Sequence, residues 1–364
     1  MLTEKPGIGP GLLFCLVFAV VLGYGLPRIA FLGAKYIGPN GYWGLILAFI
    51  LSLPVILAIV SLGRNFPEHS LLELLPLLFG RPAGVVLGLL YVLFFLALMI
   101  WEIRAAVEIF HIYFLVRTPV GVTIVALILS AAYIASKGIE GITRLAAFLF
   151  ILPLLFILLS LVASYQGFDP DNVRPVFFFE GGKIFSGTVH LFDPFLPLAS
   201  LFLIYRYFTE KQKLKGFKVI VAAAGLAGIL LLAMMVGTIG VFGAKKVAML
   251  SWPFMELTKH SDLPYLLQTT GLFFACVYLI EAVISLGAIY FTAADAAARL
   301  IKHLTYKWFL AILFPIITWA ALNVKSELES LQFFDGLRIA GFVAVFVLPL
   351  VIWIGTAVFH RRLI

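Results

Sequence analysis

Long apolar runs alternate with short polar connections along almost the whole chain. Ten of these runs come close to or exceed the roughly 20 residues that a helix needs to cross the hydrocarbon core of a bilayer. They cover residues 8–31, 41–63, 84–113, 119–136, 142–164, 189–208, 216–241, 269–292, 307–322 and 339–359. The pattern predicts an all-α membrane protein with ten transmembrane helices.

Two of the runs are interrupted, and they hold matching places in the two halves of the chain. The first is broken at Gly23–Arg28 and the sixth at Phe192–Pro197. Glycine disfavours a helix by about 1 kcal/mol and proline by about 3 kcal/mol, so both helices are expected to unwind there. Unwound backbone inside a bilayer has to face protein or a polar cavity. A matched pair of broken spans is typical of a transporter-type binding site.

Ten spans with broken first and sixth members divide into two groups of five. An odd number of spans per group places the halves in opposite orientations. We therefore expect a single membrane domain, residues 1–364, built from two inverted five-helix repeats at about 8–164 and 189–359. The halves share no obvious residue-level repeat, so this division rests on hydropathy and on the two breaks.

Composition agrees with a membrane protein and argues against most enzymes. The chain is 63% hydrophobic and 12% charged, against roughly 45–50% and 25% in soluble domains. Both cysteines lie in apolar spans and the six histidines are scattered, so we expect neither a disulfide framework nor a metal site. Phosphate loops and nucleophile elbows are missing from the sequence. The sequence predicts a protein that is not an enzyme and has no cofactor.

The net charge of +8 is interpreted as membrane topology, and no nucleic-acid partner is expected. With the N-terminus inside, fifteen Lys and Arg residues face the cytoplasm. Nine face outside, Arg338 among them, and Arg28 and Arg104 lie within spans. This bias predicts that both termini are cytoplasmic.

Two connections carry local signals. In the cytoplasmic loop 65–82, Ser70 and Glu73 have the spacing of a helix-capping pair. In the external segment 243–268, a short surface helix is expected around Pro253–Lys259.

Six ionisable residues fall inside the predicted spans, and each would cost roughly 3 kcal/mol in lipid. They must face the bundle, pair with one another or lie near an interface, and several are expected to be structural. They are Arg28, Glu102, Arg104, Glu108, Asp193 and Glu281.

The first break suggests an anion site. Free N–H groups at Gly23, Tyr24 and Gly25 would attract a group such as a substrate carboxylate. The alternative is close helix packing by the glycines with a kink at Pro27. Taken alone, the alternative is slightly stronger, but the matching break in the sixth span favours the binding site.

Two charged residues beside the breaks each have two interpretations. Asp193 could receive an amine, a cation or a proton, or it could cap a half-helix that continues with Pro194. Arg28 could gate the external entrance by pairing with an acid, or its side chain could snorkel to the membrane interface.

The third and eighth spans contribute further candidates. Arg104, Glu108 and His111 share one helical face, which indicates a structural ion pair near the outer end. Glu102 points to nearly the opposite face, where it could line a central cavity. In the eighth span, Glu281 shares a face with Tyr278 and Ser285. Both acids are candidates for cation or proton coupling, with a structural role as the alternative.

Several motifs resemble the endospore germination permeases, the B subunits of nutrient germinant receptors. The resemblance covers essentially the whole chain, and its most specific part runs from residue 117 to residue 144. It rests on Leu115-Val116-Arg117-Thr118-Pro119, Tyr133, Gly138-Ile139-Glu140-Gly141, Arg144, Pro153, the Gly23–Pro27 break, Asn65-Phe66-Pro67 to Leu78-Phe79-Gly80 and Asn172-Val173-Arg174-Pro175. Two places depart from the family pattern, namely 264–278 and Ala147-Phe148, so the chain is a divergent member.

The resemblance implies a leucine-transporter-like fold of the amino acid–polyamine–organocation superfamily. It also implies a place in the inner membrane of a bacterial spore, beside an A subunit and a lipoprotein C subunit, and recognition of a small nutrient such as an amino acid. In related transporters the first break contacts the substrate carboxylate, which corresponds here to Gly23, Tyr24 and Gly25. The sixth-span break corresponds to Phe192, Asp193 and Pro194.

Three hypotheses follow: a ligand-sensing receptor subunit, an ion-coupled secondary amino acid transporter, or a structural scaffold without a ligand. For the first two, one set of residues is expected to bind the ligand. The set is Gly23, Tyr24, Gly25, Pro27, Glu102, Phe192, Asp193, Pro194, Tyr278, Glu281 and Ser285.

Overall fold

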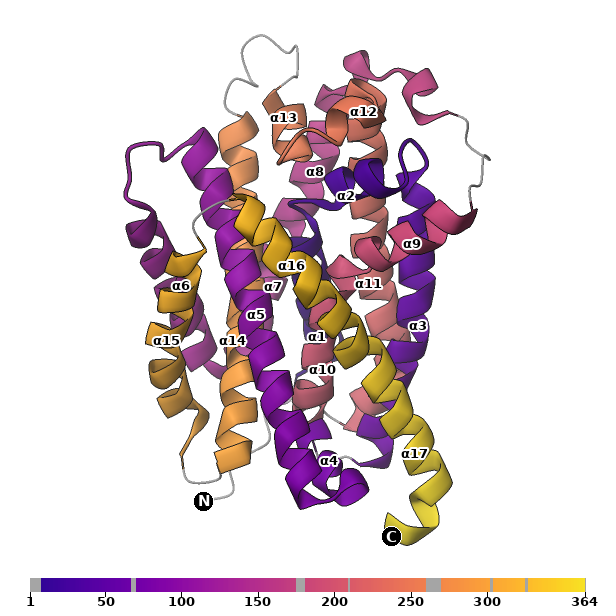
Figure 1. The fold of residues 1–364 in the computed structure, drawn as a ribbon, viewed down its shortest axis with the longest axis vertical. Helices are drawn as coiled ribbons and strands as arrows, with labels where there is room; N and C mark the ends of the chain where they lie inside the picture. The colour runs from indigo at the N-terminus through magenta and orange to yellow at the C-terminus, as the bar shows by residue number, and fades with distance from the viewer. Residues whose placement is uncertain are drawn as a thin grey trace.

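The fold is described from a computed structural model, which covers residues 8–66, 70–174, 181–208, 210–259, 270–301, 304–324 and 327–363. This part of the chain is almost entirely helical (Figure 1). The first part of the departure from the family pattern at 264–278, residues 264–269, lies outside the described residues, and its remainder belongs to helix α14 (Thr270–Ile301).

The predicted spans are found as helices. Within the described residues, seven helices are long and apolar enough to cross a membrane, and the count rises to nine when each of two bent pairs is taken as one span. Val120–Ser136 is a further apolar helix of 17 residues. The α-helices of the described residues are α1 (Pro10–Gly25), α2 (Ile29–Tyr36), α3 (Gly41–Asn65), α4 (Leu71–Phe79), α5 (Arg81–Tyr113), α6 (Val120–Ser136), α7 (Gly138–Leu149), α8 (Ile151–Ala163), α9 (Gly181–Leu191), α10 (Ala199–Ile204), α11 (Glu210–Phe242), α12 (Ala244–Val247), α13 (Pro253–Lys259), α14 (Thr270–Ile301), α15 (Tyr306–Asn323), α16 (Glu327–Phe342) and α17 (Leu348–Leu363).

The two bent pairs are the interrupted first and sixth spans. α1 and α2 meet at an angle of 54°, and α9 meets the segment Asp193–Tyr207 at 45°. That segment consists of the 3₁₀ helix η3 (Asp193–Leu198), α10 and the short 3₁₀ helix η4 (Tyr205–Tyr207). The predicted breaks in these two spans are therefore confirmed. The repeat boundaries at 8–164 and 189–359 remain a prediction.

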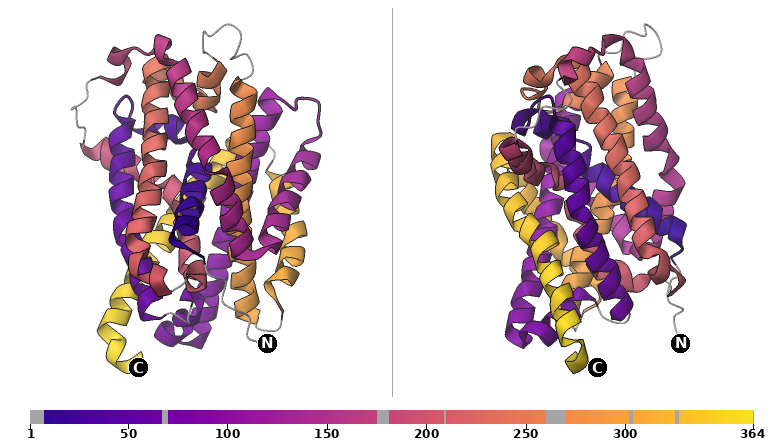
Figure 2. Two further views of the ribbon diagram at one scale, coloured as in Figure 1. Left: turned by 180° about the vertical axis from the view of Figure 1, so that it is seen from behind. Right: turned by 90° about the vertical axis from the view of Figure 1, so that its right-hand side faces the viewer.

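Helix α1 lies near the middle of the bundle, where it packs against α11, α14 and α7 (Figure 2). Every residue from Leu16 to Gly25 is buried. A helix that is buried on all sides carries no polar face, which explains why this run shows no amphipathic pattern.

α1 begins and α17 ends at the same end of the bundle, and α4 lies at that end as well (Figure 1). Glu73 Oε2 accepts the backbone N–H of Ser70 at 2.8 Å, which confirms the predicted capping pair at the start of α4. α12 and α13 lie at the opposite end. The α13 helix was predicted at the right residues, but its surface position is wrong, because Phe254, Met255 and Leu257 are buried.

Large apolar side chains on the outside of the bundle indicate a lipid-facing surface. Leu89 and Leu93 of α5, Leu155 of α8 and Trp319 of α15 are 53%, 52%, 56% and 69% exposed. Together with the long apolar helices, this surface identifies a multi-pass membrane protein.

Candidate ligand site

The first break differs in one respect from the sequence prediction. α1 continues through Gly25, and the Leu26 N–H still donates to the Leu22 carbonyl at 2.9 Å. The helix is interrupted only at Leu26–Arg28, before α2 begins at Ile29. The prediction of free N–H groups at Gly23, Tyr24 and Gly25 is therefore wrong, because these residues lie inside the last turns of a helix.

The two glycines instead permit close contact between helices. A Cβ atom on Gly23 would lie 3.0 Å from the Glu281 carbonyl oxygen on α14. On Gly25, a Cβ atom would lie 2.7 Å from Leu231 Cδ1 and 2.8 Å from the Pro194 ring. Gly25 therefore holds the first break directly against the second one, and the alternative of close helix packing accounts for both glycines.

We expect Gly23→Ala to lower the free energy of unfolding by about 1–3 kcal/mol, the usual cost of overpacking. The added methyl group would meet backbone atoms of α14, which can only yield if the helix moves. Thermal unfolding in detergent, followed by tryptophan fluorescence, measures the effect. Gly228→Ala on α11 is the matched control, because a Cβ there meets nothing within 4 Å. Equal melting temperatures of the two variants would contradict the prediction.

At the second break, the carboxylate of Asp193 forms a buried ion pair with Arg338. Arg338 Nε lies 2.9 Å from Oδ1 and Arg338 Nη2 lies 3.0 Å from Oδ2. Asp193 is 4% exposed and Arg338 is 3% exposed. The placement of Arg338 outside the membrane region is therefore wrong. The cap of η3 is Phe192 rather than Asp193.

The Asp193–Arg338 pair extends to the outer parts of both bent spans. Arg338 also binds Asp335 at 2.7 Å and contacts His190 Nδ1. The His190 ring of α9 stacks on Tyr36 of α2, with 3.6 Å between centroids. These contacts join α2, α9, η3 and α16 around one buried charge pair.

A small closed cavity lies where the two breaks meet. Its volume is about 10 Å³, which is about the space of one water molecule. It is lined by Tyr24, Gly25, Pro27, Arg28, Ile29, Leu32, Trp101, Asp193 and Pro194. A ligand larger than a water molecule therefore fits here only if the two broken spans separate.

Two larger hollows do not belong to this site. A groove of about 770 Å³ lies between α5 and α16–α17, and one of about 310 Å³ lies between α5, α6 and α14. Their linings are almost wholly apolar and include exposed side chains such as Leu90 and Val122. They are grooves on the lipid-facing side of the bundle.

Arg28 lies at the first break and borders the closed cavity. It is 4% exposed, so the interpretation that it snorkels to the interface is wrong. Its guanidinium carbon lies over the rings of Trp252, Trp101 and Phe31, at 4.7, 5.3 and 5.3 Å from their centroids. Cation–π attraction of this kind stabilises a desolvated guanidinium by about 2 kcal/mol.

A second polar cluster lies deeper in the bundle, between α5 and α14. Ser285 Oγ donates to Glu102 Oε2 at 3.1 Å. Glu102, Glu281, Tyr278 and Ser285 are each at most 1% exposed. Among the described residues, Glu102 Oε1, Glu281 Oε2 and the Tyr278 hydroxyl have no hydrogen-bond partner. The structure thus brings these four predicted residues together, next to Gly23.

The structural ion pair predicted on the third span is confirmed. Arg104 Nη2 lies 3.1 Å from Glu108 Oε1. His111 does not join it and instead makes a 3.0 Å hydrogen bond with Thr123 of α6.

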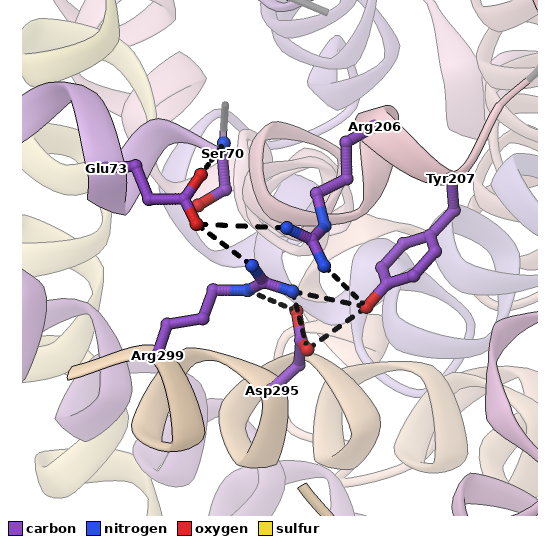
Figure 3. A network of polar contacts seen from close by, with 6 residues as sticks. All are labelled: Ser70, Glu73, Arg206, Tyr207, Asp295 and Arg299. Atoms are coloured by element: carbon purple, nitrogen blue, oxygen red, sulfur yellow. Dashed lines mark hydrogen bonds and ion pairs between the residues drawn. The ribbon is translucent and has the colours of Figure 1, made fainter. Parts of the chain in front are cut away.

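A polar network closes the end of the bundle where α4 lies (Figure 3). Arg299 of α14 binds Asp295 through Nε at 2.8 Å and Nη2 at 2.9 Å, and Glu73 of α4 at 3.1 Å. The Tyr207 hydroxyl at the end of the sixth span donates to Asp295 at 3.1 Å and accepts from Arg206 at 3.2 Å. The network ties α4, η4 and α14 together.

Sequence reasoning missed Arg338, Trp101 and Trp252 as neighbours of the site. Arg338 lies just before the tenth apolar run, three residues after Asp335, and this spacing hinted only at a local pair. The two tryptophans looked like ordinary apolar or interfacial residues. Their contact with Arg28 joins segments far apart in the chain, so no local pattern could have revealed it.

The model of the spore germination protein family matches residues 8–329. The chain belongs to the spore germination protein family. Among its family relatives in Bacillus subtilis (strain 168), spore germination protein B2 is 23% identical over 93% of this chain and 92% of that protein. Spore germination protein A2 is 25% identical over 95% of this chain and 94% of that protein.

The fold of this spore germination protein family member is leucine-transporter-like. The crystal structure of MhsT in complex with L-phenylalanine matches it with a TM-score of 0.71 at 16% identity, covering 98% of this chain and 90% of that one. A substrate-bound Na⁺-coupled sialic acid symporter matches with a TM-score of 0.67 at 15% identity, covering 94% of this chain and 80% of that one. The family and these folds belong to membrane receptors or transporters, so the chain is not an enzyme.

Proposed function

We propose that this chain is the ligand-binding membrane subunit of a spore nutrient germinant receptor. Its ligand is a small nutrient, with a free amino acid as the best-fitting class, and its binding triggers germination. The subunit works in the inner membrane of the spore together with A and C subunits of the receptor. Membership of the spore germination protein family supports this role.

One observation carries the proposed binding site. The two bent spans meet at a closed cavity whose lining includes a buried cation, Arg28, and a buried anion, Asp193. A zwitterionic amino acid carries one group of each sign, and a buried charge is stabilised by an oppositely charged partner, as Asp193 is by Arg338. The lining is otherwise apolar, as is usual for small-molecule sites.

We expect Gly25→Ala to weaken nutrient binding at least tenfold. The added methyl group would lie 2.7–2.8 Å from Leu231 and Pro194, so it would hold the two breaks apart and prevent closure around the ligand. Ligand-dependent thermal stabilisation of the full chain in nanodiscs, measured over a panel of the twenty amino acids, nucleosides and sugars, gives the affinities. Gly228→Ala, which adds the same methyl group far from any neighbour, should bind like the unmodified chain.

Two results of this experiment would count against the proposal. If no compound of the panel stabilises the unmodified chain, the role as a nutrient-binding subunit fails. If a compound binds equally well to the Gly25→Ala variant, the site is not between the breaks.

An ion-coupled secondary amino acid transporter is the second candidate. The buried cluster of α5 and α14 supports it, since Glu102 Oε1 and Glu281 Oε2 lack partners within the described part of the chain. Buried ionisable groups of this kind mark proton and cation pathways in membrane proteins. Uptake of labelled amino acids into proteoliposomes separates the candidates: accumulation that requires a proton or sodium gradient favours transport, whereas binding without accumulation favours a receptor.

A further inference from the structure

We propose that the end of the bundle where α12 and α13 lie carries a second binding site, which takes a zwitterionic amino acid (Figure 1). The site is a hollow of about 130 Å³, lined by Phe242, Lys246, Leu250, Glu256 and Lys259. The proposal takes its ligand class from the proposed function. It adds a place where that ligand binds without any separation of the two broken spans.

The hollow has room for a small organic molecule as the helices stand. Its volume is more than ten times that of the closed cavity between the breaks, which is about 10 Å³. Phe242 and Leu250 give it an apolar wall, and the other three lining residues carry charges. Apolar walls with a few placed polar groups are usual for small-molecule sites. The two larger grooves have almost wholly apolar linings and offer no such charges.

Aromatic rings hold both lysines at the hollow. The Lys259 ammonium lies 3.9 Å from the centroid of the Tyr113 ring, and the Lys246 ammonium lies 4.6 Å from that of Phe242. A ring face attracts an ammonium charge without satisfying its three N–H donors as an oxygen acceptor would. In the part of the chain that the structure describes, neither lysine side chain forms a hydrogen bond or an ion pair. Their donors are therefore available to a carboxylate.

Glu256 supplies the opposite charge, and its position is fixed from α5. The Tyr113 hydroxyl donates to Glu256 Oε1 at 2.6 Å. Tyr113 thus places Glu256 through its hydroxyl and Lys259 through its ring. Among the described residues, no ion pair joins Glu256 to either lysine, so the three charges do not neutralise one another. An amino acid can place its carboxylate at the lysines and its ammonium group at Glu256, in charge-assisted hydrogen bonds.

The chain itself connects this hollow to the first break. Leu250 and Glu256 flank Trp252, whose ring centroid lies 4.7 Å from the guanidinium carbon of Arg28. The segment that forms one wall of the hollow is therefore also the segment that covers Arg28. The charge bias of the loops predicts that this end of the bundle faces outside. A nutrient arriving from outside then meets the hollow before the broken spans separate.

Protection of the lysines from a brief pulse of an amine-acylating reagent tests the site in the full chain in nanodiscs. Mass spectrometry of the digested protein gives the acylation rate of each lysine. Lys245 is the internal control, because it is exposed on the same helix as Lys246 but does not line the hollow. Dividing by the Lys245 rate cancels the reagent that free amines consume.

The probes are L-alanine, propionate, which lacks the amino group, ethylamine, which lacks the carboxylate, and inorganic phosphate. L-alanine suffices as the amino acid, because the charges of the site address groups that all amino acids share. It should slow acylation of Lys246 and Lys259, relative to Lys245, at concentrations roughly tenfold lower than propionate needs, the effect expected for one further charge-assisted hydrogen bond. Ethylamine should protect neither lysine.

Two variants separate the parts of the site. Glu256→Gln keeps an acceptor for the Tyr113 hydroxyl but removes the negative charge, so L-alanine should then protect the lysines no better than propionate does. Glu140→Gln on α7 is the matched control, because Glu140 lies far from the hollow in the chain and does not line it. Protection by L-alanine should be unchanged in that variant.

The failures of the two proposals are distinct. Equal protection by L-alanine and inorganic phosphate, or no protection by L-alanine, overturns the second site and leaves the junction of the broken spans untouched. Gly25→Ala, which weakens binding at the junction, should leave the protection intact, because Gly25 does not line the hollow. If the protection disappears in Gly25→Ala, the lysines report binding at the junction and the second site falls. If protection persists while no nutrient binds at the junction, the proposed receptor site fails and the second site stands.

Discussion

Replacing Arg338 with glutamine should destabilise the protein by about 3–5 kcal/mol, the usual cost of removing one partner of a buried ion pair. Asp193 would keep its place at the sixth-span break, 4% exposed, without the two hydrogen bonds that now satisfy its carboxylate. Thermal unfolding of Arg338→Gln in detergent, compared with the unmodified chain, measures the loss.

An exposed ion pair of the same residue types provides the control. Arg174 and Asp171 are 2.9 Å apart, but their side chains are 68% and 77% exposed. Such surface pairs contribute about 0–1 kcal/mol, so Arg174→Gln should leave the melting temperature nearly unchanged. If both variants lose the same stability, the burial of the Asp193 charge does not matter.

A double variant tests the physical reason. Arg338→Gln combined with Asp193→Asn removes both charges, so it should recover a large part of the stability lost in the single variant. A double variant that is less stable than either single variant would show that the two side chains contribute independently, without the coupling expected of an ion pair.

Replacing Arg299 with glutamine should cost about 2–4 kcal/mol and loosen α4 from the bundle. Of its contacts within the described residues, Asp295 would retain the hydrogen bond from Tyr207, and Glu73 would lose the nearer of its two arginine partners there. The effect is smaller than for Arg338, because the Arg299 and Glu73 side chains are 14% and 36% exposed and water can replace part of the network. Hydrogen exchange of the α4 amides should accelerate in this variant, together with a lower melting temperature.

Arg144→Gln is the matched control for Arg299. It removes the cation of another i, i+4 pair, with Glu140, whose side chains are 70% and 39% exposed. Hydrogen exchange of the α4 amides should be unaffected in the Arg144→Gln variant. Unchanged exchange in the Arg299→Gln variant would mean that apolar contacts of α4 with α5, and not the network, hold α4 in place.

The helices could be predicted from the sequence because the bilayer imposes a simple rule. A span needs a long apolar run whatever its neighbours are, so all ten runs were visible, and the breaks at Pro27 and Pro194 followed from local backbone chemistry. The predicted pair Ser70–Glu73 and the ion pair Arg104–Glu108 were also local, at three and four residues' separation. Their confirmation required nothing beyond helix geometry.

The candidate site was predicted less completely. Glu102, Glu281, Tyr278 and Ser285 lie together, since each points inward from its helix to keep polar atoms out of lipid. The partner of Asp193 could not be predicted, because 145 residues separate it from Arg338. The position of the first break was misjudged by a few residues. Two nearby glycines can indicate either an unwound helix or a close contact between helices, and the local sequence does not distinguish the two.

The sequence by itself determined that the chain is a helical membrane protein with ten apolar runs, two of which are broken. It could do so because hydropathy and backbone propensity act over short stretches of chain. Only the tertiary structure decided which charges are neutralised by other parts of the chain. It paired Asp193 with Arg338, surrounded Arg28 with Trp101 and Trp252, and closed the cavity to about 10 Å³. Burial makes each of these charges costly until a specific partner meets it, and that partner is chosen by the way the helices pack.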